Sequence, residues 1–527
     1  MAVTIPAPIP MSTISRASAP RSLESVLRDV PGARLLSGAP GTEVTGIAFD
    51  SRRVRPGELF VAVPGLKRDG REFVPQAAAN GAATIASEAP VPDGPFARVE
   101  LAAARPALAD LAAAFYGHPS RRLTLVGVTG TDGKTSTTRL LSAVLEAAGR
   151  RTGWLTTVDL KIGNEQRPND YHLTTPEAVG VQSFLCELAE AGLEVGVLEV
   201  SSHALALDRV RGCEFDVAVF TNLSPEHLNF HGDLEQYLEA KASLFRMLDE
   251  PSAKGGPRFG VINADDPASG RIAAACRAPI LTYAIDSAAD VTAAEIELRP
   301  DGARFVLTTP SGRAEVATRL LGRFNVQNWL AAAAAAHALG IGPEPVAQAA
   351  GDLPPVRGRM EPIDRGQPFA VVVDFAHTPQ ALETALRTLR RQTTGRLLLV
   401  FGNAGERDPA SRPAMGRLAA ELADFFVISM DDPLHEDPAE IATEAAAGAE
   451  QSGAVRGRQF EIELDRRRAI QAVLERARPG DAVLLAGKGH EPRMLVGDAR
   501  LPWDDRRVAE ELLDIISAHD RVSPRRA

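Results

Sequence analysis

Blocks of apolar residues separated by short polar loops run along most of the chain. Residues 123–128 are apolar and rich in β-formers, a Gly/Thr loop follows, and residues 138–148 have helical spacing that ends at Gly149. The same unit of strand, loop and helix recurs, which predicts a mostly parallel sheet covered by helices. Further buried strands of this sheet are expected at 195–200, 215–220 and 259–262.

A second series of apolar runs begins after Pro354 and Pro355, where we expect the chain to change domain. Its expected strands are 370–373, 396–401, 425–429 and 482–486. Residues before 120 carry shorter apolar runs between Gly and Pro turns, as in a small α/β domain. The pattern therefore predicts a disordered tail and three domains, with bounds 1–20, 21–120, 121–355 and 356–527.

Composition and charge narrow the classes of function. The 527 residues are 45% hydrophobic, and 58 Lys+Arg against 68 Asp+Glu give a net charge of −10. This balance argues against a surface built to neutralise nucleic acid or anionic lipid. No window approaches the roughly 18 to 20 apolar residues of a membrane helix, and three scattered cysteines are too few for a disulfide framework. We expect a cytoplasmic protein with no nucleic acid or membrane partner.

Polar residues follow each expected strand directly. Ligands of open parallel sheets gather beyond the carboxyl ends of the strands. The polar followers are 129–136, 199–203 and 221–227 in the first sheet, and 374–377, 402–407, 431–433 and 487–491 in the second. Two polar strand-end faces predict one site between two domains.

The strongest single motif is the loop Gly130-Thr131-Asp132-Gly133-Lys134-Thr135-Ser136. Its glycines let backbone N–H groups approach phosphate oxygens, Lys134 can neutralise β/γ charge, and Thr135 can reach Mg²⁺. The loop departs from the general P-loop pattern, because Val128 stands five positions before Gly133. A tight turn at a helix start is the alternative, but the strand before and the helix after favour phosphate binding.

Several further residues are ordinary taken singly. Glu199, His227 and Lys241 gain interest from their place in the phosphate-loop sheet, because Mg²⁺ near a γ-phosphate needs hard oxygen or imidazole ligands. Asn325 either caps a helix or contacts a purine. Arg359, at the expected domain junction, is either a linker charge or a phosphate ligand.

Taken in order, these motifs resemble the Mur ligase family, the ATP-dependent enzymes that add amino acids to the cell-wall precursor. The matching stretches are 127–135, 199–203, 221–224 with His227, 237–241, 325–328, 358–361, 374–379 and 487–491. The N-terminal stretches 49–52, 57–62 and 69–71 resemble the MurE branch, which joins the third residue of the stem peptide to UDP-N-acetylmuramoyl-L-alanyl-D-glutamate.

This resemblance implies a fold and a division of labour. It implies a small N-terminal α/β domain for the UDP-substrate, a central P-loop ATPase domain and a C-terminal Rossmann-like domain for the amino acid. We expect a monomer. ATP would phosphorylate the free carboxylate of the D-glutamate residue, and an amine would then displace phosphate to form an amide. The implied cofactors are ATP and Mg²⁺.

The resemblance also assigns roles to residues of this chain. Catalysis falls to Lys134, Glu199, His227 and Lys241, with Thr135 and Glu199 at one Mg²⁺ and Glu199, His227 and a carbamylated Lys241 at a second. The nucleotide is implied at Gly130, Thr131, Asp132, Gly133, Lys134, Thr135, Ser136, Asn325, Arg359 and Asp374. The UDP-sugar peptide is implied at Phe49, Ser51, Thr174, Thr175, Ser201 and Arg209.

The most informative departure from the family lies in the stretch that selects the amino acid. Enzymes that add meso-diaminopimelate carry Asp-Asn-Pro-Arg there, and this chain has Asp431-Asp432-Pro433-Leu434. Without the arginine, the distal carboxylate of meso-diaminopimelate has no guanidinium partner, whereas a lone distal ammonium suits the aspartates. We therefore predict L-lysine or L-ornithine, with Arg407, Gly487 and Glu491 implied at the shared amino-acid site.

Three alternatives stay open at this point. The same ligase could add meso-diaminopimelate. A switch or motor ATPase would also use a phosphate loop, but the second polar sheet argues against it. Folylpolyglutamate synthetase shares the ATP chemistry with a folate acceptor, but lacks the MurE-like N-terminal segment. Within the family pattern this chain also differs in having Asp132 for Asn, Leu207 for Gln, and Leu173 for Asn, and Glu226 and Asn229 where Asp is usual.

Overall fold

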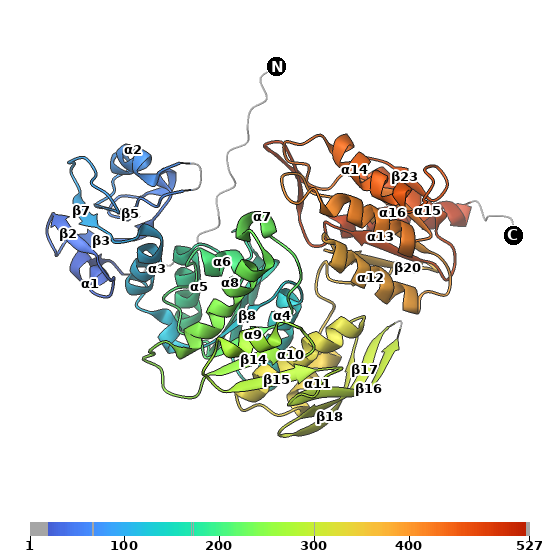
Figure 1. Cartoon of the computed structure of the whole chain (residues 1–527), viewed down its shortest axis with the longest axis horizontal. Coiled ribbons are helices and arrows are strands. Elements are labelled where there is room, and N and C mark those ends of the chain that lie inside the picture. Colours follow the sequence, from blue (N-terminus) through green and yellow to red (C-terminus); the bar gives the residue numbers. More distant parts are fainter. Residues whose placement is uncertain (1–18, 66–67, 170, 172, 300, 523–527) are drawn as a thin grey trace, which may run out of the picture.

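The computed structural model describes residues 19–65, 68–169, 171, 173–299 and 301–522, and the predicted tail falls almost wholly outside them. Figure 1 shows three parts in chain order: an N-terminal part in blue, a central part from teal to yellow, and a C-terminal part in orange. Each has its own main sheet and hydrophobic core. The predicted α/β architecture is confirmed.

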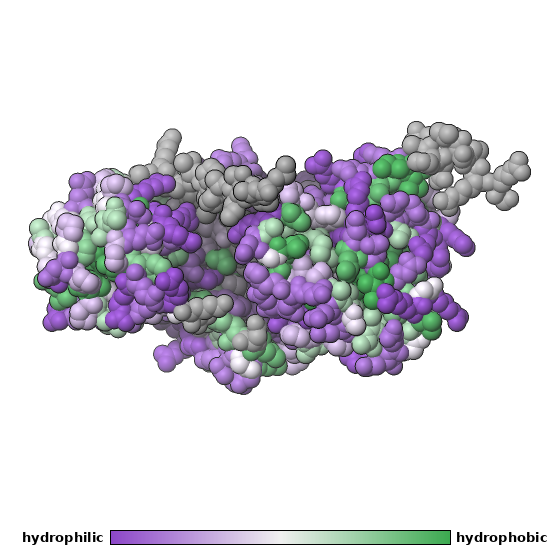
Figure 2. Space-filling model, turned by 90° about the horizontal axis from the view of Figure 1, so that it is seen from above, coloured by the Kyte–Doolittle hydropathy of each residue, from purple (hydrophilic) through white to green (hydrophobic). Residues whose placement is uncertain are grey.

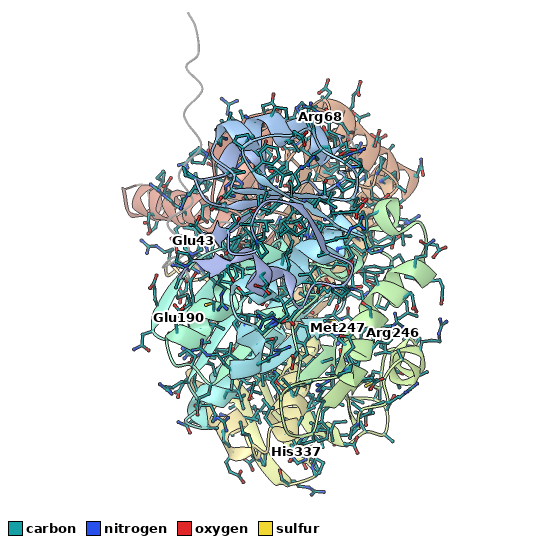
Figure 3. All side chains as sticks on the ribbon, turned by 90° about the vertical axis from the view of Figure 1, so that its left-hand side faces the viewer. Glu43, Arg68, Glu190, Arg246, Met247 and His337 are labelled. Carbon is teal, nitrogen blue, oxygen red and sulfur yellow. The ribbon has the colours of Figure 1, made fainter. Side chains whose placement is uncertain are left out.

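The N-terminal part is built on a five-stranded sheet with the order β2-β7-β6-β5-β4. Strands β4 to β7 run parallel and β2 is antiparallel. Helix α3 (Ala104–Phe115) packs its Leu108, Leu111 and Phe115 into the core of this sheet. In the side view of Figure 3, Arg68 marks this part of the molecule, and His337 of the central part lies at the opposite end. The bounds are β1 Arg21–Ser22, α1 Leu23–Leu27, β2 Arg34–Ser37, β3 Glu43–Val44, β4 Ile47–Ala48, β5 Leu59–Val61, α2 Val74–Ala79, β6 Thr84–Ser87 and β7 Ala97–Glu100.

The central part holds an eleven-stranded sheet. Its middle, in the order β9-β12-β8-β13-β14-β15-β16, is parallel as predicted. Antiparallel strands β10 and β11 extend one edge and β17 and β18 the other, which the sequence analysis did not predict. The bounds are β8 Thr124–Thr129, β9 Thr152–Leu155, β10 Asp159–Ile162, β11 Glu165–Pro168, β12 Val195–Glu199, β13 Val217–Phe220, β14 Phe259–Asn263, β15 Ile280–Ala284, β16 Val291–Arg299, β17 Gly302–Thr309 and β18 Gly312–Thr318.

Helices cover both faces of this sheet. Helices α4 (Lys134–Ala147), α10 (Arg323–Ala338) and α11 (Glu344–Asp352) pack on one face. Helices α5 (Ala178–Glu190) and α8 (Leu234–Arg246) pack on the other, and α6 (Ser202–Ala206), α7 (Leu228–His231) and α9 (Ser269–Ala274) are short. Helix α4 begins at Lys134, four residues before the predicted start, because Gly133 adopts φ 82° and lets the helix follow the loop directly. No helix in the described ranges is long and apolar enough to cross a membrane.

The C-terminal part is a six-stranded sheet with the order β19-β20-β24-β21-β22-β23, parallel except for β19. Helices α12, α13 and α14 cover one face, and α15 and α16 the other. The bounds are β19 Glu361–Ile363, β20 Ala370–Asp374, α12 Pro379–Gln392, β21 Leu397–Phe401, α13 Ser411–Leu422, β22 Phe425–Ile428, α14 Pro438–Gln451, β23 Phe460–Ile462, α15 Arg466–Arg476, β24 Ala482–Ala486, β25 Arg493–Val496, β26 Ala499–Pro502 and α16 Asp505–Val522.

A buried ion pair joins the two helices on the second face of this sheet. Arg466, the first residue of α15, donates to both carboxylate oxygens of Asp505 at 2.8 and 2.6 Å, and both side chains are 0% exposed. The remaining N–H groups of Arg466 reach the carbonyls of Met430, in the loop after β22, and of Ala486, the last residue of β24. The pair thus holds the chain where it leaves these two strands.

We predict that Asp505→Asn lowers the free energy of unfolding by about 3–5 kcal/mol, because it leaves a buried guanidinium without its counter-ion. The matched control is Glu235→Gln, which breaks an exposed Arg271–Glu235 pair and should change stability by less than about 1 kcal/mol. Urea titrations followed by circular dichroism would measure both. Equal effects of the two substitutions would contradict the role given to Arg466.

Candidate active site

A cleft of about 800 Å³ lies between the carboxyl ends of the central strands and those of the C-terminal strands. The two polar strand-end faces predicted from the sequence therefore line one cavity. Seen from above in Figure 2, hydrophilic residues predominate on the surface and apolar residues are scattered. The predicted site residues in the lining are Gly130, Thr131, Asp132, Gly133, Lys134, Thr135, Ser136, Thr174, Glu199, Ser201, Arg209, His227, Lys241, Arg359, Asp374, Arg407, Asp431, Asp432, Gly487 and Glu491.

The phosphate loop between β8 and α4 is held from two sides. Thr221, just after β13, donates its hydroxyl to the carbonyl of Asp132 at 2.6 Å. On the other side, a Cβ at Gly133 would lie 2.5 Å from the amide oxygen of Asn328 on α10. Position 133 therefore requires glycine for two reasons, its positive φ and the close approach of Asn328. The second reason is not evident from the motif alone.

Two lysine ammonium groups converge on one carbonyl oxygen of this loop. Lys134 Nζ donates to the carbonyls of Gly130 at 3.0 Å and Thr131 at 2.6 Å, and Lys241 Nζ donates to Gly130 at 2.7 Å. Lys241 is 1% exposed and lies 4.1 Å from the ring centre of Tyr237. Burial, and then the charge of Lys134, hold the pKa of Lys241 well below its ordinary value.

Oxygen donors gather around Glu199, at the end of β12. Its carboxylate accepts from the Thr135 hydroxyl at 2.9 Å, and from the backbone N–H and hydroxyl of Thr157 at 2.9 and 3.0 Å. Hydroxyl and carboxylate oxygens are the ligands that Mg²⁺ prefers, so these residues fit the ion that the sequence implies. Sequence reasoning missed Thr157, although it lies only two residues after the end of a strand, β9.

His227 stands beside an acid that reaches across the cleft. Burial lowers the pKa of His227 to about 4, so its ring is neutral near pH 7. Glu226 places one carboxylate oxygen 3.5 Å from His227 Nε2 and 3.5 Å from Nε2 of His377, which follows β20 in the C-terminal sheet. Although burial opposes ionisation of Glu226, these two histidines hold its pKa below the ordinary value. The contact bridges the two sheets.

The other predicted nucleotide residues differ in their surroundings. Asn325 is buried, donates to the carbonyl of Leu321 at 2.8 Å and lies outside the cleft lining, whereas Asn328 lines the cleft. Asn325 is also not the helix cap, because Gly322 takes that place in α10. Asp374 accepts from the backbone N–H of Met360 at 2.6 Å, and burial raises its pKa to about 6. Arg359 lies 4.8 Å over the Phe375 ring.

The expected sugar-peptide residues fall into two groups. Thr175 donates to the carbonyl of Glu199 at 2.8 Å and accepts from the N–H of Ser201 at 3.0 Å, and Arg209 donates to the carbonyl of Thr175 at 3.2 Å. These contacts hold the stretch with Thr174 against the end of β12. Phe49 and Ser51 belong to the N-terminal part and lie outside the cleft lining, and Ser51 donates to Gln76 at 2.7 Å.

An unpredicted cation lies behind the acidic wall of the cleft. Lys488 is 0% exposed, donates to Asp432 at 2.7 Å and to Glu491 at 2.6 Å, and has Nζ 3.5 Å from Asp431. Although burial opposes ionisation of Asp431, Lys488 holds the pKa of that carboxyl below its ordinary value. Lys488 belongs to the stretch 487–491 noted in the sequence, where no role was given to it.

The loop that follows Asp432 is tied to its neighbours. Leu434 has φ 53°, and its backbone N–H donates to the carbonyl of Leu495 at 3.2 Å. Pro433 and Leu434 lie outside the lining of the cleft. The imidazole of His435 lies between two carboxylates, 2.7 Å from Glu406 in the loop of Arg407 and 3.4 Å from Asp498 in the turn between β25 and β26. His435 thus connects three loops at this end of the cleft.

Models of one family match most of the chain. The matches are to the Mur ligase family, catalytic domain, over 43–116, the Mur ligase middle domain over 128–336, and the Mur ligase, glutamate ligase domain, over 358–489.

Similar proteins carry related names. The chain is 48% identical over 481 residues to a UDP-N-acetylmuramyl-tripeptide synthetase of Roseiflexus sp. (strain RS-1), covering 89% of this chain and 94% of that protein. It is 42% identical over 488 residues to a UDP-N-acetylmuramoyl-L-alanyl-D-glutamate--2,6-diaminopimelate ligase of Geobacillus kaustophilus (strain HTA426), covering 92% and 98%.

Solved structures resemble the chain over most of its length. A UDP-N-acetylmuramoyl-L-alanyl-D-glutamate--2,6-diaminopimelate ligase is 31% identical with a TM-score of 0.66, covering 94% of this chain and 99% of that one. The E. coli FolC in complex with DHPP and ADP is 19% identical with a TM-score of 0.56, covering 77% and 92%. The second likeness concerns the fold alone.

We predict that His435 titrates above the usual histidine pKa, because hydrogen bonds to Glu406 and then Asp498 favour its protonated form. With the folded-state pKa raised, the stabilisation is complete below the unfolded pKa and is lost as pH rises through the folded value. An NMR titration would measure the pKa. The Glu406→Gln substitution should lower the pKa of His435 more than Asp498→Asn does, since the Glu406 contact is the shorter. An unchanged pKa in Glu406→Gln would contradict the role given to these two contacts.

Proposed function

The chain belongs to the Mur ligase family, ATP-dependent amide ligases that add an amino acid to a UDP-N-acetylmuramoyl peptide, and we propose that it adds L-lysine or L-ornithine to UDP-N-acetylmuramoyl-L-alanyl-D-glutamate. The family excludes the alternative of a switch or motor ATPase. One observation carries the proposal: a single cleft places the phosphate loop of the central sheet opposite an acidic wall of the C-terminal sheet. The first suits a nucleotide, and the second suits a basic amino acid.

The reaction must activate a carboxylate, which at neutral pH is a poor acyl donor. We propose that the free carboxylate of the D-glutamate residue attacks the γ-phosphorus of ATP, so that ADP leaves and an acyl phosphate forms. The amine of the amino acid then attacks the acyl carbon, the tetrahedral intermediate expels phosphate, and the amine gives up a proton. Lys134 would offset the charge of the phosphoryl group, with the N–H groups of the 130–136 loop as further donors.

We propose Thr135 and Glu199 as ligands of one Mg²⁺, and Glu199, His227 and Lys241 as ligands of a second. The oxygen donors around Glu199 and the neutral ring of His227 support this. Bound Mg²⁺ would neutralise phosphate charge in both steps. An ammonium would repel the second ion, so Lys241 is proposed to carry a carbamate: its neutral amine bonds to the carbon of CO₂, loses a proton and becomes an anionic oxygen ligand.

The other site residues follow the same division. Asn325, Arg359 and Asp374 are proposed at the nucleotide, where Asn325 would act through Asn328, to which it is hydrogen-bonded at 3.1 Å. Thr174, Thr175, Ser201 and Arg209 are proposed at the muramoyl peptide. Phe49 and Ser51 are proposed near uridine in the N-terminal part. Helix α3 is the last α-helix of this part before the chain enters the central sheet at β8.

The choice of amino acid rests on charge. Asp431, Asp432 and Glu491 line the cleft with one buried ammonium among them, so the wall is net negative. A distal ammonium gains from that wall, whereas a distal carboxylate would need a cation that Leu434 does not supply. Arg407, Gly487 and Glu491 are proposed to hold the amino-acid end. Addition of meso-diaminopimelate by the same ligase is the runner-up, because relatives are named for it.

We further propose that the enzyme acts in the cytoplasm as a monomer. The exposed large apolar residues in the described part of the chain are scattered over several elements, which supports a surface without a large apolar interface. Domain divisions near residues 120 and 355 are proposed with it, since the three main sheets fall on either side of them.

The first test is ADP release with ATP, Mg²⁺ and UDP-N-acetylmuramoyl-L-alanyl-D-glutamate, offering L-lysine, L-ornithine and meso-diaminopimelate in parallel. Release is expected with lysine or ornithine. Leu434→Arg should raise kcat/KM for meso-diaminopimelate relative to L-lysine by at least about tenfold, by adding a bidentate partner for its carboxylate. Leu434→Met is the uncharged control and should not. Preference of the unaltered enzyme for meso-diaminopimelate would overturn the assignment.

The second test concerns Lys241. Lys241→Met should lower kcat at least about 100-fold, because it removes the proposed anionic ligand. The matched control is Lys254→Met, which removes another largely buried lysine, paired with Asp216 at 2.6 Å away from the cleft, and should keep kcat within about threefold. Carbon-13 NMR with labelled bicarbonate would detect the carbamate in the parent enzyme. Full activity of Lys241→Met would contradict the proposal.

A further inference from the structure

Lys488 is the one buried ammonium in the acidic wall of the cleft within the described residues. It lies in the loop that follows β24, and its two hydrogen bonds go to Asp432, in the loop after β22, and to Glu491, three residues farther along its own loop. Both of these carboxylates line the cleft, and Lys488 does not. The lysine therefore joins two walls of the amino-acid site from behind.

The three carboxylates around Lys488 form a set that could hold a metal ion. One oxygen each of Asp431, Asp432 and Glu491 lie within 4.8 Å of one another. Three such groups repel one another in a buried setting unless a cation or a proton intervenes. The Lys488 ammonium supplies that cation, and three carboxylates with one ammonium leave two net negative charges.

Lys488 occupies some of the carboxylate oxygens of the wall and leaves others available to the substrate. Asp432 Oδ1 accepts from Lys488 and also from the backbone N–H of Leu495 at 2.9 Å, so this oxygen is already occupied. Glu491 gives one oxygen, Oε2, to Lys488. Asp431 lies farther from the ammonium, at 3.5 Å, and lies against Gly487, where a Cβ would be 2.5 Å from its Oδ2. Asp431 and the second oxygens of Asp432 and Glu491 take no part in these hydrogen bonds.

The structural support of these loops comes from another residue. Arg466 reaches the carbonyls of Met430, at the start of the loop that carries Asp432, and of Ala486, directly before the loop that carries Lys488, while Asp505 balances its charge. Lys488 touches only side chains of the cleft wall in these contacts. Its loss should therefore alter the charge and orientation of the wall more than the fold.

We propose that Lys488 is a positioning residue for the amino acid: its ammonium takes the place of a metal ion and fixes Asp432 and Glu491. Asp431 is thereby directed to the incoming basic side chain, and the second Glu491 oxygen to its amino-acid end. This inference rests on the proposed function, because it assumes that a diamino acid occupies the site. By this count the wall, with two net negative charges, attracts one further cation.

The test is a charge-balance cycle of Lys488→Met, Asp432→Asn and the double variant. Lys488→Met makes the wall more negative and leaves its carboxylates free to turn, and Asp432→Asn makes it less negative, so each should raise KM for L-lysine or L-ornithine at least about tenfold. KM for ATP should stay within about twofold. The double variant restores the original net charge and should recover part of the loss.

A second readout does not depend on the substrate. Without nucleotide, Mn²⁺ titration followed by electron paramagnetic resonance should show one more site in Lys488→Met than in the unaltered protein, because the three carboxylates become available. The double variant should bind this extra ion more weakly. If Lys488→Met alone does not fold, the comparison of Asp432→Asn with the double variant decides, since only the double variant has the original charge.

Two outcomes would overturn the inference. One is an unchanged KM for the diamino acid, and the other is an equal rise of the KM values for ATP and the diamino acid, which a general loss of structure would give. Failure of the proposed function looks different: the unaltered enzyme would release no ADP with either diamino acid, while the extra Mn²⁺ site of Lys488→Met would still appear.

Discussion

Two lysine side chains directed at one carbonyl oxygen set the requirements of the cleft. Lys134 and Lys241 both donate to Gly130, and protonation of both would place two like charges together where water is scarce. Burial and the charge of Lys134 therefore lower the pKa of Lys241, and a polyanion beside Lys134 would offset the charge that remains. The opposite wall has the reverse problem, because Asp431, Asp432 and Glu491 share one ammonium. Each wall is thus complementary to a different part of the reaction.

Parallel sheets make this opposition of charges possible. Their carboxyl ends carry the loops, so two sheets that face each other by these edges bring loops far apart in sequence into one cavity. Glu226 already spans the gap to His377, beside the proposed metal ligand His227. Movement of one sheet relative to the other would therefore reach the catalytic residues through this carboxylate.

Much of this arrangement was predictable from sequence, because polar residues after buried strands mark the edge of a parallel sheet. The phosphate loop, Glu199 and Asp431 were found in this way. Thr157 follows the same rule but was missed, since β9 is short and its apolar run weak. Lys488 could not be assigned a role, because its burial depends on Asp432, 56 positions away in sequence. The cap interpretation of Asn325 was wrong, because the N-cap of α10 is Gly322.

Other features cannot be predicted from a local sequence pattern. The antiparallel strands β10, β11, β17 and β18 extend both edges of the central sheet, and short apolar runs do not indicate which strands will pair. The placement of Ser51 outside the cleft depends on where the N-terminal part lies, and nothing in the stretch 49–52 fixes that.

The alanine-rich middle of α10 has a consequence for how this protein can vary. The residues from Ala331 to Ala336 are all at most 1% exposed. Six consecutive residues point to all sides of a helix, so this part of α10 is surrounded by other parts of the protein. A larger side chain has no room there, and glycine would weaken the helix. The same helix carries Asn328, which lies against the phosphate loop at Gly133. We therefore expect lineages of this enzyme to diverge at the surface while the six-residue segment keeps nearly the same composition.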